Sequence, residues 1–551
     1  MWLDRSDNLH GLPDQDEMDL SDHNRGTKRK YSGDKHLGAS PDDVTSARHS
    51  TPPFPDHTTT IRSTDVDRRD EEYYRTLYDR ELNFRVLGKQ DAALGALLQG
   101  GGGGSHLDFA DPHAVMQLTK TLLRLDFSLR IELPLDRLCP PVPNRHNYVL
   151  WLKDLVDSSS PSYSQAYEPE RRVTGLDIGT GASLIYPLLA CAQRPAWSFV
   201  ATDVDAKSLA FARRNVELNN LQSRVRVEGR HVDASLVPLD ELGIEAMDFV
   251  MVNPPFYTSE FELLDLARLK SRPPNSACTG APIEMVCEGG EVGFVSRIIE
   301  ESLELRTRVQ WYTSMLGKQS SLDVLIGILV EHGIDNYAVT AFVQGNKTRR
   351  WALGWSFGHR RPSVRASRSS ELTVSKRLLP FPTESTVIRE SLSVIDIHAA
   401  KRVLCEAMES LSLVSWEWDV RVSRGVGFAD GNVWSRSYRR RKERQQQATA
   451  SSSPQHHDVS TKNIKTKPEP DLSTIQKPRH GIADCAFGFT ISVQVERNAH
   501  DAGDRVVLVV RWLQGRDYQL FESFTGMIRN TILRLARTSE GDQVVAESAS
   551  A

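Results

Sequence analysis

Between residues 173 and 256 the chain alternates short apolar runs with amphipathic segments, and this alternation constrains the fold more than any other feature. The apolar runs lie near 173–178, 197–203 and 247–252, and the segments between them carry apolar residues at helical spacing. Repeated strand–helix–strand units of this kind form a mostly parallel sheet that is covered by helices. Further strand and helix patterns continue to a hairpin around 345–346. We therefore predict an α/β, Rossmann-like domain that closes near residue 362.

Composition divides the rest of the chain. Residues 1–70 are polar and lack apolar periodicity, so we expect a disordered tail. The Rossmann-like domain, with a helical N-terminal extension, should span 71–362, and a linker should span 363–392. Residues 393–540 predict a small α+β domain of one helix, three alternating strands and a second helix, split by a disordered basic insertion at 436–482. Residues 541–551 should be a disordered tail.

Charge and cysteine usage exclude several classes of protein. Lys and Arg total 68 against 72 Asp and Glu, so the chain has no global basic signature for nucleic acid and would need local patches. The six cysteines are scattered singly, which predicts a reducing compartment and no metal site. No run of about 18 apolar residues occurs and the N-terminus is polar, so we expect a soluble intracellular protein without a membrane span. Lys28-Arg29-Lys30 is either a short import signal or a solvated charge run.

A glycine-rich turn follows the first apolar run. Gly179 and Gly181 come directly after Asp177-Ile178, where a strand should give way to a helix. Structural turns also use such glycines, but Asp203 lies 22 residues beyond Gly181 at the end of the next predicted strand, where a carboxylate binds ribose hydroxyls. A dinucleotide site would usually have a third glycine where Leu184 stands. The pattern favours S-adenosylmethionine as the cofactor.

The tetrapeptide Asn253-Pro254-Pro255-Phe256 follows the predicted strand 247–252 and indicates the chemistry. Ligands bind at the carboxyl ends of the strands in open α/β sheets. The Asn253 side-chain oxygen and the Pro254 carbonyl can accept both hydrogens of a planar amino group, the prolines stiffen this geometry, and Phe256 offers a face for a base to stack on. We predict methylation of such a nitrogen. A structural Pro-Pro turn is the alternative.

Several further segments, together with these two, make the chain resemble the methyltransferase-like protein 16 family, which is similar to the bacterial large-subunit rRNA adenine-N6 methyltransferases. The resemblance covers roughly residues 71–360. It implies an RNA N6-adenosine methyltransferase that acts in the nucleus on an unpaired adenosine of U6 small nuclear RNA; we expect a monomer. The segments that carry it are 143–148, 177–182, 253–256, 288–291, 311–318 and 350–357.

The resemblance also assigns residues to the cofactor and to RNA. It places Arg145 near the methionine carboxylate of the cofactor, Gly179 and Ser183 along the cofactor, and Asp203 on its ribose. A guanidinium pairs well with a carboxylate, although an arginine in a Pro-rich loop is often a plain surface residue. The RNA candidates, which could instead be solvated loop residues, are Arg268, Lys270, Arg272, Lys347, Arg349 and Arg350.

Residues 393–540 resemble the C-terminal regions of the same family, which adopt a kinase-associated-1-like fold and help to grip U6 RNA; a protein–protein module is the alternative. Two departures put N-terminal RNA contacts in question. A longer tail of mixed charge replaces the family's basic arm, and the glycine run at 100–104 is extra.

Two other functions remain open from the sequence. A glutamine N5 methyltransferase acting on a protein uses the same kind of tetrapeptide, although those enzymes generally carry Tyr at the position of Phe256. A non-catalytic factor that binds U6 RNA is the second alternative, because intact motifs do not measure turnover.

Overall fold

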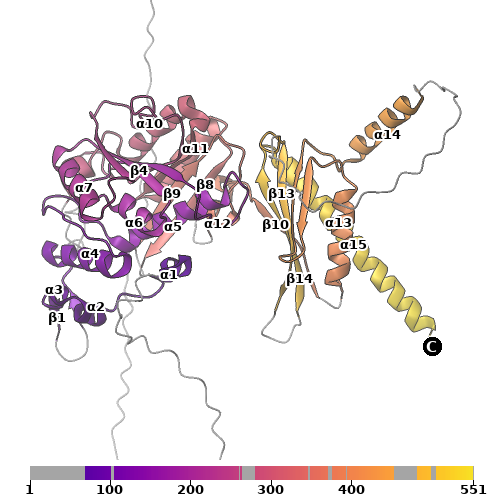
Figure 1. Ribbon diagram of the computed structural model, residues 1–551, viewed down its shortest axis with the longest axis horizontal. Helices are drawn as coiled ribbons and strands as arrows, with labels where there is room; N and C mark the ends of the chain where they lie inside the picture. The colour runs from indigo at the N-terminus through magenta and orange to yellow at the C-terminus, as the bar shows by residue number, and fades with distance from the viewer. Residues whose placement is uncertain are drawn as a thin grey trace, which may run out of the picture. The chain divides into compact units, whose positions relative to one another are not determined.

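The computed structural model describes residues 69–100, 105–259, 261–262, 280–344, 348–369, 375–391, 394–451, 481–497 and 504–549. These residues form a seven-stranded sheet, a five-stranded sheet and a two-stranded ribbon, β1 (Leu98–Gln99) with β2 (His106–Leu107) (Figure 1). The expected N-terminal tail, up to residue 68, lies outside the described residues, as does the glycine run at 101–104.

The seven-stranded sheet has the strand order β5-β4-β3-β6-β7-β9-β8. Its first five strands are parallel, and β9 and β8 are antiparallel to their neighbours. The predicted α/β class with a mostly parallel sheet is confirmed. The strands are β3 (Val173–Ile178), β4 (Trp197–Asp203), β5 (Val225–Gly229), β6 (Met247–Val252), β7 (Val309–Leu316), β8 (Tyr337–Gln344) and β9 (Thr348–Trp355).

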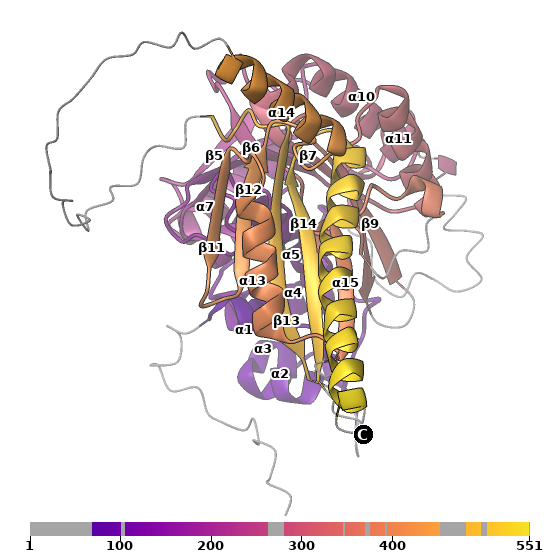
Figure 2. The ribbon, with the colours of Figure 1, turned by 90° about the vertical axis from the view of Figure 1, so that its right-hand side faces the viewer.

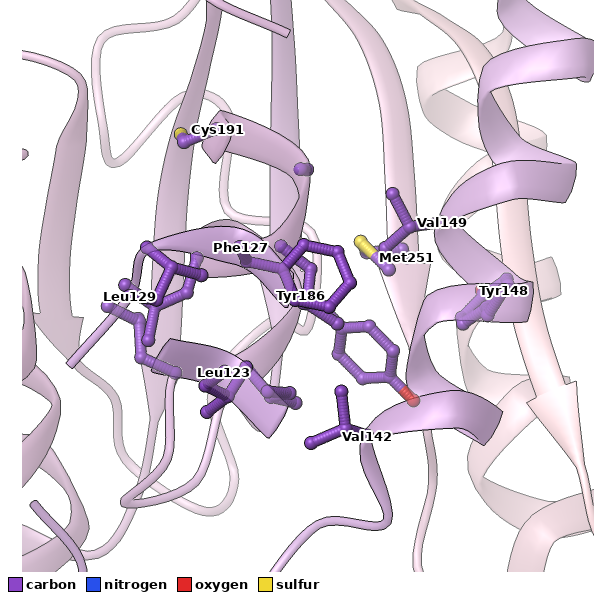
Figure 3. Close-up of a cluster of buried hydrophobic side chains, with 14 of the residues drawn as sticks. Leu123, Phe127, Leu129, Val142, Tyr148, Val149, Tyr186, Cys191 and Met251 are labelled. Atoms are coloured by element: carbon purple, nitrogen blue, oxygen red, sulfur yellow. The ribbon is translucent and has the colours of Figure 1, made fainter. Parts of the chain in front are cut away.

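Helices bury both faces of this sheet, as the long apolar strands require. One core joins the sheet to α4 (Pro112–Phe127), α5 (Val142–Ser158), α6 (Ile185–Gln193) and α7 (Ala206–Leu218). Another joins it to α10 (Gly290–Leu305) and α11 (Gln319–Glu331). Figure 3 shows part of the first core, which includes Phe127, Tyr186, Val142 and Tyr148.

The predicted N-terminal extension is helical. It consists of α1 (Glu71–Thr76), α2 (Phe84–Gln90) and α3 (Ala92–Gly95). Tyr74 of α1 is buried against Phe127 at the end of α4, with ring centroids 5.7 Å apart. This contact ties the first described helix to the core of the seven-stranded sheet.

The five-stranded sheet is antiparallel throughout and has the order β10-β14-β13-β12-β11. Two helices, α13 (Ile397–Glu409) and α15 (Tyr518–Ala549), cover one of its faces (Figure 2). Phe489 of β13 and Phe524 of α15 meet in this core with ring centroids 4.1 Å apart. The strands are β10 (Glu384–Ser391), β11 (Ser415–Asp419), β12 (Arg424–Ala429), β13 (Phe487–Glu496) and β14 (Arg505–Gln514).

This unit differs from the sequence prediction in its boundaries. The linker expected at 363–392 contains α12 (Val364–Ser367) and the strand β10, which pairs with β14. The strand β11 ends at Asp419, and Val420 and Val422 lie in the exposed turn that follows it.

Two further boundaries were drawn too broadly. The insertion expected to be disordered from 436 begins with the helix α14 (Arg436–Ser451), while residues 452–480 lie outside the described residues. The helix α15 runs on to Ala549, through most of the expected tail at 541–551.

Candidate cofactor and substrate site

The carboxyl ends of β3, β4 and β6 bring the predicted site residues to one edge of the sheet. Ile178 pairs with Val252 on one side and with Thr202 on the other, so the residues that follow these strands are neighbours. Strand order reverses here, because β4 and β5 lie to one side of β3 while β6 and β7 lie to the other. Such a reversal is where open α/β sheets bind ligands. We call residues 177–183, 203 and 253–256, together with Arg145, whose guanidinium contacts Met315 of β7, the ligand edge.

The glycine turn leaves room for a ligand at this edge. Gly179 and Gly181 have φ of 67° and 64°, a left-handed conformation that side chains with a Cβ rarely adopt. No atom lies within 4 Å of the place where a Cβ of Gly179 would stand. Ser183 is buried in the same turn. The backbone here is open to a bound molecule on its exposed side.

Asp203 closes the glycine turn from the end of β4. Its Oδ2 accepts a hydrogen bond from the Gly181 N–H at 2.8 Å, and its Oδ1 accepts one from the Asp205 N–H at 2.9 Å. Burial raises the pKa of this carboxyl, although those backbone donors partly offset the effect. Each oxygen keeps a second lone pair, so the carboxylate can still accept from a ligand hydroxyl.

Asp177 and Arg145 are two buried charged groups that the protein pairs incompletely. Asp177 accepts from the Thr180 hydroxyl at 2.7 Å through Oδ2, while its buried Oδ1 has no hydrogen-bond partner. Burial raises the pKa of Asp177 to about 7. Arg145, 6% exposed, contacts the Met315 sulfur at 3.5 Å, and among the described residues no carboxylate lies within ion-pair distance of it. A buried cation without a counterion fits a ligand that brings a carboxylate.

The tetrapeptide presents an acceptor that the protein leaves free. Asn253 follows β6 directly, and its Oδ1 is buried without a hydrogen-bond partner in the described structure. Leaving such an atom unpaired costs about 1–3 kcal/mol, so a ligand that donates a hydrogen to it gains that energy. The chain after the tetrapeptide is fixed, because the Tyr257 N–H donates to the Met285 carbonyl at 3.0 Å and the Cys287 N–H donates to the Tyr257 carbonyl at 3.0 Å.

Phe256 lies in a frame built by two elements far away in the sequence. A Cβ on Gly317 would stand 2.8 Å from Phe256 Cδ1, so the ring occupies the space that this glycine leaves. The guanidinium carbon of Arg350 lies 5.6 Å from the centre of the Phe256 ring. Burial and the positive charge of Arg145 lower the pKa of Arg350. One face of the site is therefore aromatic and flanked by a cation.

Two glutamates, Glu284 and Glu291, hold backbone segments of the site in place, and neither was predicted as a site residue from the sequence. Glu291, 2% exposed, accepts from the Gly317 N–H at 2.6 Å and from the Lys318 N–H at 3.0 Å, which holds the glycine beside Phe256. Glu284 accepts from the Leu138 and Ala281 N–H groups, and its Oε1 lies 3.8 Å from the Cβ position of Gly181. For Glu291 the available signal was its place in the segment 288–291.

The RNA candidates are only partly placed. Arg268, Lys270, Arg272 and Lys347 lie outside the described residues. Arg349 is exposed on β9 next to the half-buried Arg350. Within the described part of the chain, no group of three or more His, Cys, Asp or Glu side chains is arranged to hold a metal ion. No described helix is both long and apolar enough to cross a membrane.

The fold and the ligand edge together define a Rossmann-type methyltransferase with an Asn-Pro-Pro-Phe site. Residues 73–359 match a family model described as RNA methyltransferase. The U6 small nuclear RNA (adenine-(43)-N(6))-methyltransferase of Schizosaccharomyces pombe is 42% identical over 270 residues, which cover 49% of this chain and 67% of that protein. The RNA N(6)-adenosine-methyltransferase mettl16 of Danio rerio is 32% identical over 444 residues, covering 78% of this chain and 90% of that protein. The chain belongs to the METTL16 family of RNA methyltransferases.

A solved structure of the N-terminal domain of human METTL16 in complex with SAH is also similar. It is 38% identical, and the match covers 52% of this chain and 98% of that chain with a TM-score of 0.43. The family's methyl donor is S-adenosylmethionine, and the open glycine turn, the Asp203 carboxylate and the unpaired Arg145 fit that molecule. The predicted family, enzyme class and cofactor are confirmed.

Proposed function

We propose that this protein methylates the N6 of an unpaired adenosine in RNA, and that U6 small nuclear RNA is its substrate in the nucleus. The observation that carries the proposal is the buried, unpartnered Oδ1 of Asn253 beside the glycine turn. The names of the Schizosaccharomyces pombe and Danio rerio relatives support adenine N6 as the acceptor and, for the first, U6 RNA as the substrate.

The tetrapeptide binds the N6 amine and makes it a better nucleophile. The N6 lone pair of adenine is delocalised into the ring, which makes the amine a poor nucleophile. Asn253 Oδ1 and the Pro254 carbonyl accept the two N–H hydrogens and favour a tetrahedral nitrogen. Phe256 stacks on the flipped base, and Pro255 holds the tetrapeptide rigid. The proton leaves after methyl transfer, so the site needs no general base.

The cofactor is held by the rest of the ligand edge. Asp203 accepts from the ribose, Gly179, Gly181 and Ser183 line the turn, and Arg145 pairs with the carboxylate of the methionine part. Asp177 offers its free oxygen to the same end of the molecule. When bound, S-adenosylmethionine supplies a methyl group on a positively charged sulfur.

RNA reaches the site along basic residues. Arg350 lies beside the Phe256 ring and Arg349 is exposed next to it on β9. We assign further phosphate contacts to Arg268, Lys270, Arg272 and Lys347, which lie outside the described residues. The five-stranded unit supplies a second surface that binds the RNA. This is supported by the Danio rerio match of 444 residues, which is longer than the segment from 71 to 362. A monomer suffices for this scheme, because one chain carries every group that it uses.

The test is methyl transfer from labelled S-adenosylmethionine to a U6-like RNA with one unpaired adenosine. A matched RNA carries inosine at that position and therefore lacks the N6 amine. Asn253→Ala is compared with Glu300→Gln, an exposed change on α10. We expect label only in the adenosine RNA, and a rate about 100- to 1000-fold lower for Asn253→Ala, because one acceptor for the developing charge is lost.

Three other results would contradict the proposal. Label in a protein but not in RNA would identify a glutamine N5 methyltransferase. Tight binding of the RNA without label would identify a non-catalytic binding factor. Equal rates for Asn253→Ala and Glu300→Gln would remove the tetrapeptide from the mechanism.

A further inference from the structure

A buried polar cluster lies behind the cofactor site, where α1 meets α5 and α6. Lys153 of α5 is fully buried, and its Nζ lies 2.9 Å from Glu71 Oε1 and 2.9 Å from Gln193 Oε1. The second oxygen of Glu71 lies 2.6 Å from the guanidinium of Arg194, which also pairs with Asp157 at 2.7 Å. One carboxylate from α1 thus contacts two buried cations, and Asp157 supplies the second negative charge.

His146 extends this cluster, and its two hydrogen bonds show which ring nitrogen carries the proton. Gln193 Oε1 accepts a hydrogen bond from the Lys153 ammonium. The Gln193 amide nitrogen Nε2 therefore faces His146 and donates to its Nδ1, with 3.3 Å between the two nitrogens. The proton of the neutral ring is then on Nε2, which donates to the Tyr74 carbonyl at 2.7 Å. Burial lowers the pKa of His146 to about 4, in keeping with a neutral ring. We call Glu71, Tyr74, His146, Lys153, Gln193 and Arg194 the strap cluster.

The strap cluster and the cofactor site share the first turns of α5. Arg145 directly precedes His146, and its guanidinium reaches the other way, to the Met315 sulfur and to within 5.8 Å of the centre of the Tyr186 ring. The start of α5 has no side-chain cap, since its N-cap residue is Pro141. The helix end that carries Arg145 therefore depends on its neighbours for its position. One polar contact of these first turns is the hydrogen bond from His146 Nε2 to the Tyr74 carbonyl of α1.

We propose that α1 is a positioning element for the cofactor: Glu71 and the Tyr74–His146 hydrogen bond hold the first turns of α5 so that Arg145 meets the cofactor carboxylate. Glu71 and His146 are positioning residues, because each acts through the position of Arg145. The inference rests on the pairing of Arg145 with that carboxylate in the proposed function. It adds that residues outside the Rossmann-like sheet set the affinity for one end of the cofactor.

The test uses the full chain and two small-molecule probes. S-adenosylhomocysteine carries the amino-acid carboxylate, whereas 5′-methylthioadenosine has the same nucleoside without it. Glu71→Gln is compared with Glu72→Gln, which removes the same charge from an exposed neighbour. By calorimetric titration, we expect Glu71→Gln to weaken S-adenosylhomocysteine about tenfold and 5′-methylthioadenosine less than about twofold, and Glu72→Gln to change neither.

A second variant covers the case in which Glu71→Gln unfolds. His146→Phe keeps a ring beside Phe127, whose centroid lies 5.2 Å from that of His146, but it loses both hydrogen bonds. We expect the same selective loss of affinity for S-adenosylhomocysteine. A general loosening of the fold would instead weaken both probes alike.

The outcomes separate this inference from the proposed function. Arg145→Met should lose affinity for S-adenosylhomocysteine alone; if it binds that probe as wild type does, the carboxylate assignment in the proposed function fails. If Arg145→Met is selective but Glu71→Gln and His146→Phe weaken neither probe, or both equally, the strap inference alone is overturned.

Discussion

The ligand edge and the strap cluster are two buried polar regions that meet on α5, and they differ in whether their buried cations have a counterion. At the ligand edge the acceptors Asn253 Oδ1 and Asp177 Oδ1 are buried without partners, and Arg145 has no counterion among the described residues. In the strap cluster both cations, Lys153 and Arg194, have a carboxylate oxygen within 3 Å, although Arg194 Nε is buried without a hydrogen-bond partner.

This difference shows two roles for buried polar groups, namely binding a ligand and fixing the structure. A buried group without a partner costs free energy in the folded chain, so it persists where a ligand completes it. A buried charge with its partner in place fixes the geometry of the elements that carry it, and removing one partner is expensive. Changes at the ligand edge should therefore affect function with little cost in stability. Changes in the strap cluster should affect stability and, through Arg145, the cofactor.

Outside the tetrapeptide itself, filling the space beside Phe256 should give the largest effect. In Gly317→Ala the new methyl group would lie 2.8 Å from Phe256 Cδ1 and displace the ring. We expect the methylation rate to fall about 100-fold, because a misplacement near 1 Å costs about that much. The matched control is Gly327→Ala inside α11, where a Cβ meets no atom within 4 Å. Single-turnover rates measure both, and an equal decrease in the two variants would contradict the role of the Phe256 ring.

Removing the charge of Arg145 should lower the affinity for the cofactor without lowering the stability of the fold. Arg145→Met replaces a buried guanidinium that lacks an ion pair with an apolar side chain of similar length. We expect the affinity for S-adenosylmethionine to fall about 30-fold, about 2 kcal/mol, through loss of a charged hydrogen-bonding pair. The melting temperature without ligand should stay the same or rise. A large decrease in that temperature would show that Arg145 is structural.

The sequence predicted the ligand edge better than the strap cluster, for a physical reason. Gly179, Asp203 and Asn253 each follow an apolar strand, and parallel strands bring their carboxyl ends together whatever the rest of the chain does. The Glu71–Lys153 pair joins residues far apart in sequence, and helical periodicity does not reveal which helices meet. Within α5, the lysine Lys153 stands among buried apolar residues, and this was the local sequence feature that indicated a buried ion pair.

The C-terminal sheet shows where strand patterns fail. β12 reads Arg-Gly-Val-Gly-Phe-Ala, and its glycines have low strand propensity. They are needed there because a Cβ on Gly425 or Gly427 would overlap the rings of Trp416 and Phe489 at 2.0 Å and 2.4 Å. β10 was assigned to a linker, since only its pairing with β14 defines it.

The strap cluster should respond to acid through His146. The folded state holds the pKa of this ring near 4, below the usual 6.5, so its contribution to stability is complete above pH 6.5 and is lost as the pH falls toward 4. Between pH 6.5 and 5 the unfolding free energy of wild type should lose about 2 kcal/mol relative to His146→Phe. Urea titrations across this range measure the difference. A constant difference would mean that the fold leaves the pKa of this ring at its ordinary value, and the prediction would be wrong.

The smallest effect tests the exposed side of the ligand edge. Arg349 is exposed on β9, so its phosphate contact should be worth less than the buried Arg145 pairing. We expect Arg349→Ala to weaken RNA about threefold and to lower the salt dependence by about one counterion, with the cofactor affinity unchanged. Arg226→Ala is the control, because that side chain is 51% exposed on β5, an edge strand remote from β9 in the sheet order. If both variants bind RNA like wild type in a salt series, RNA does not follow β9, and the cation beside Phe256 serves the stacked base alone.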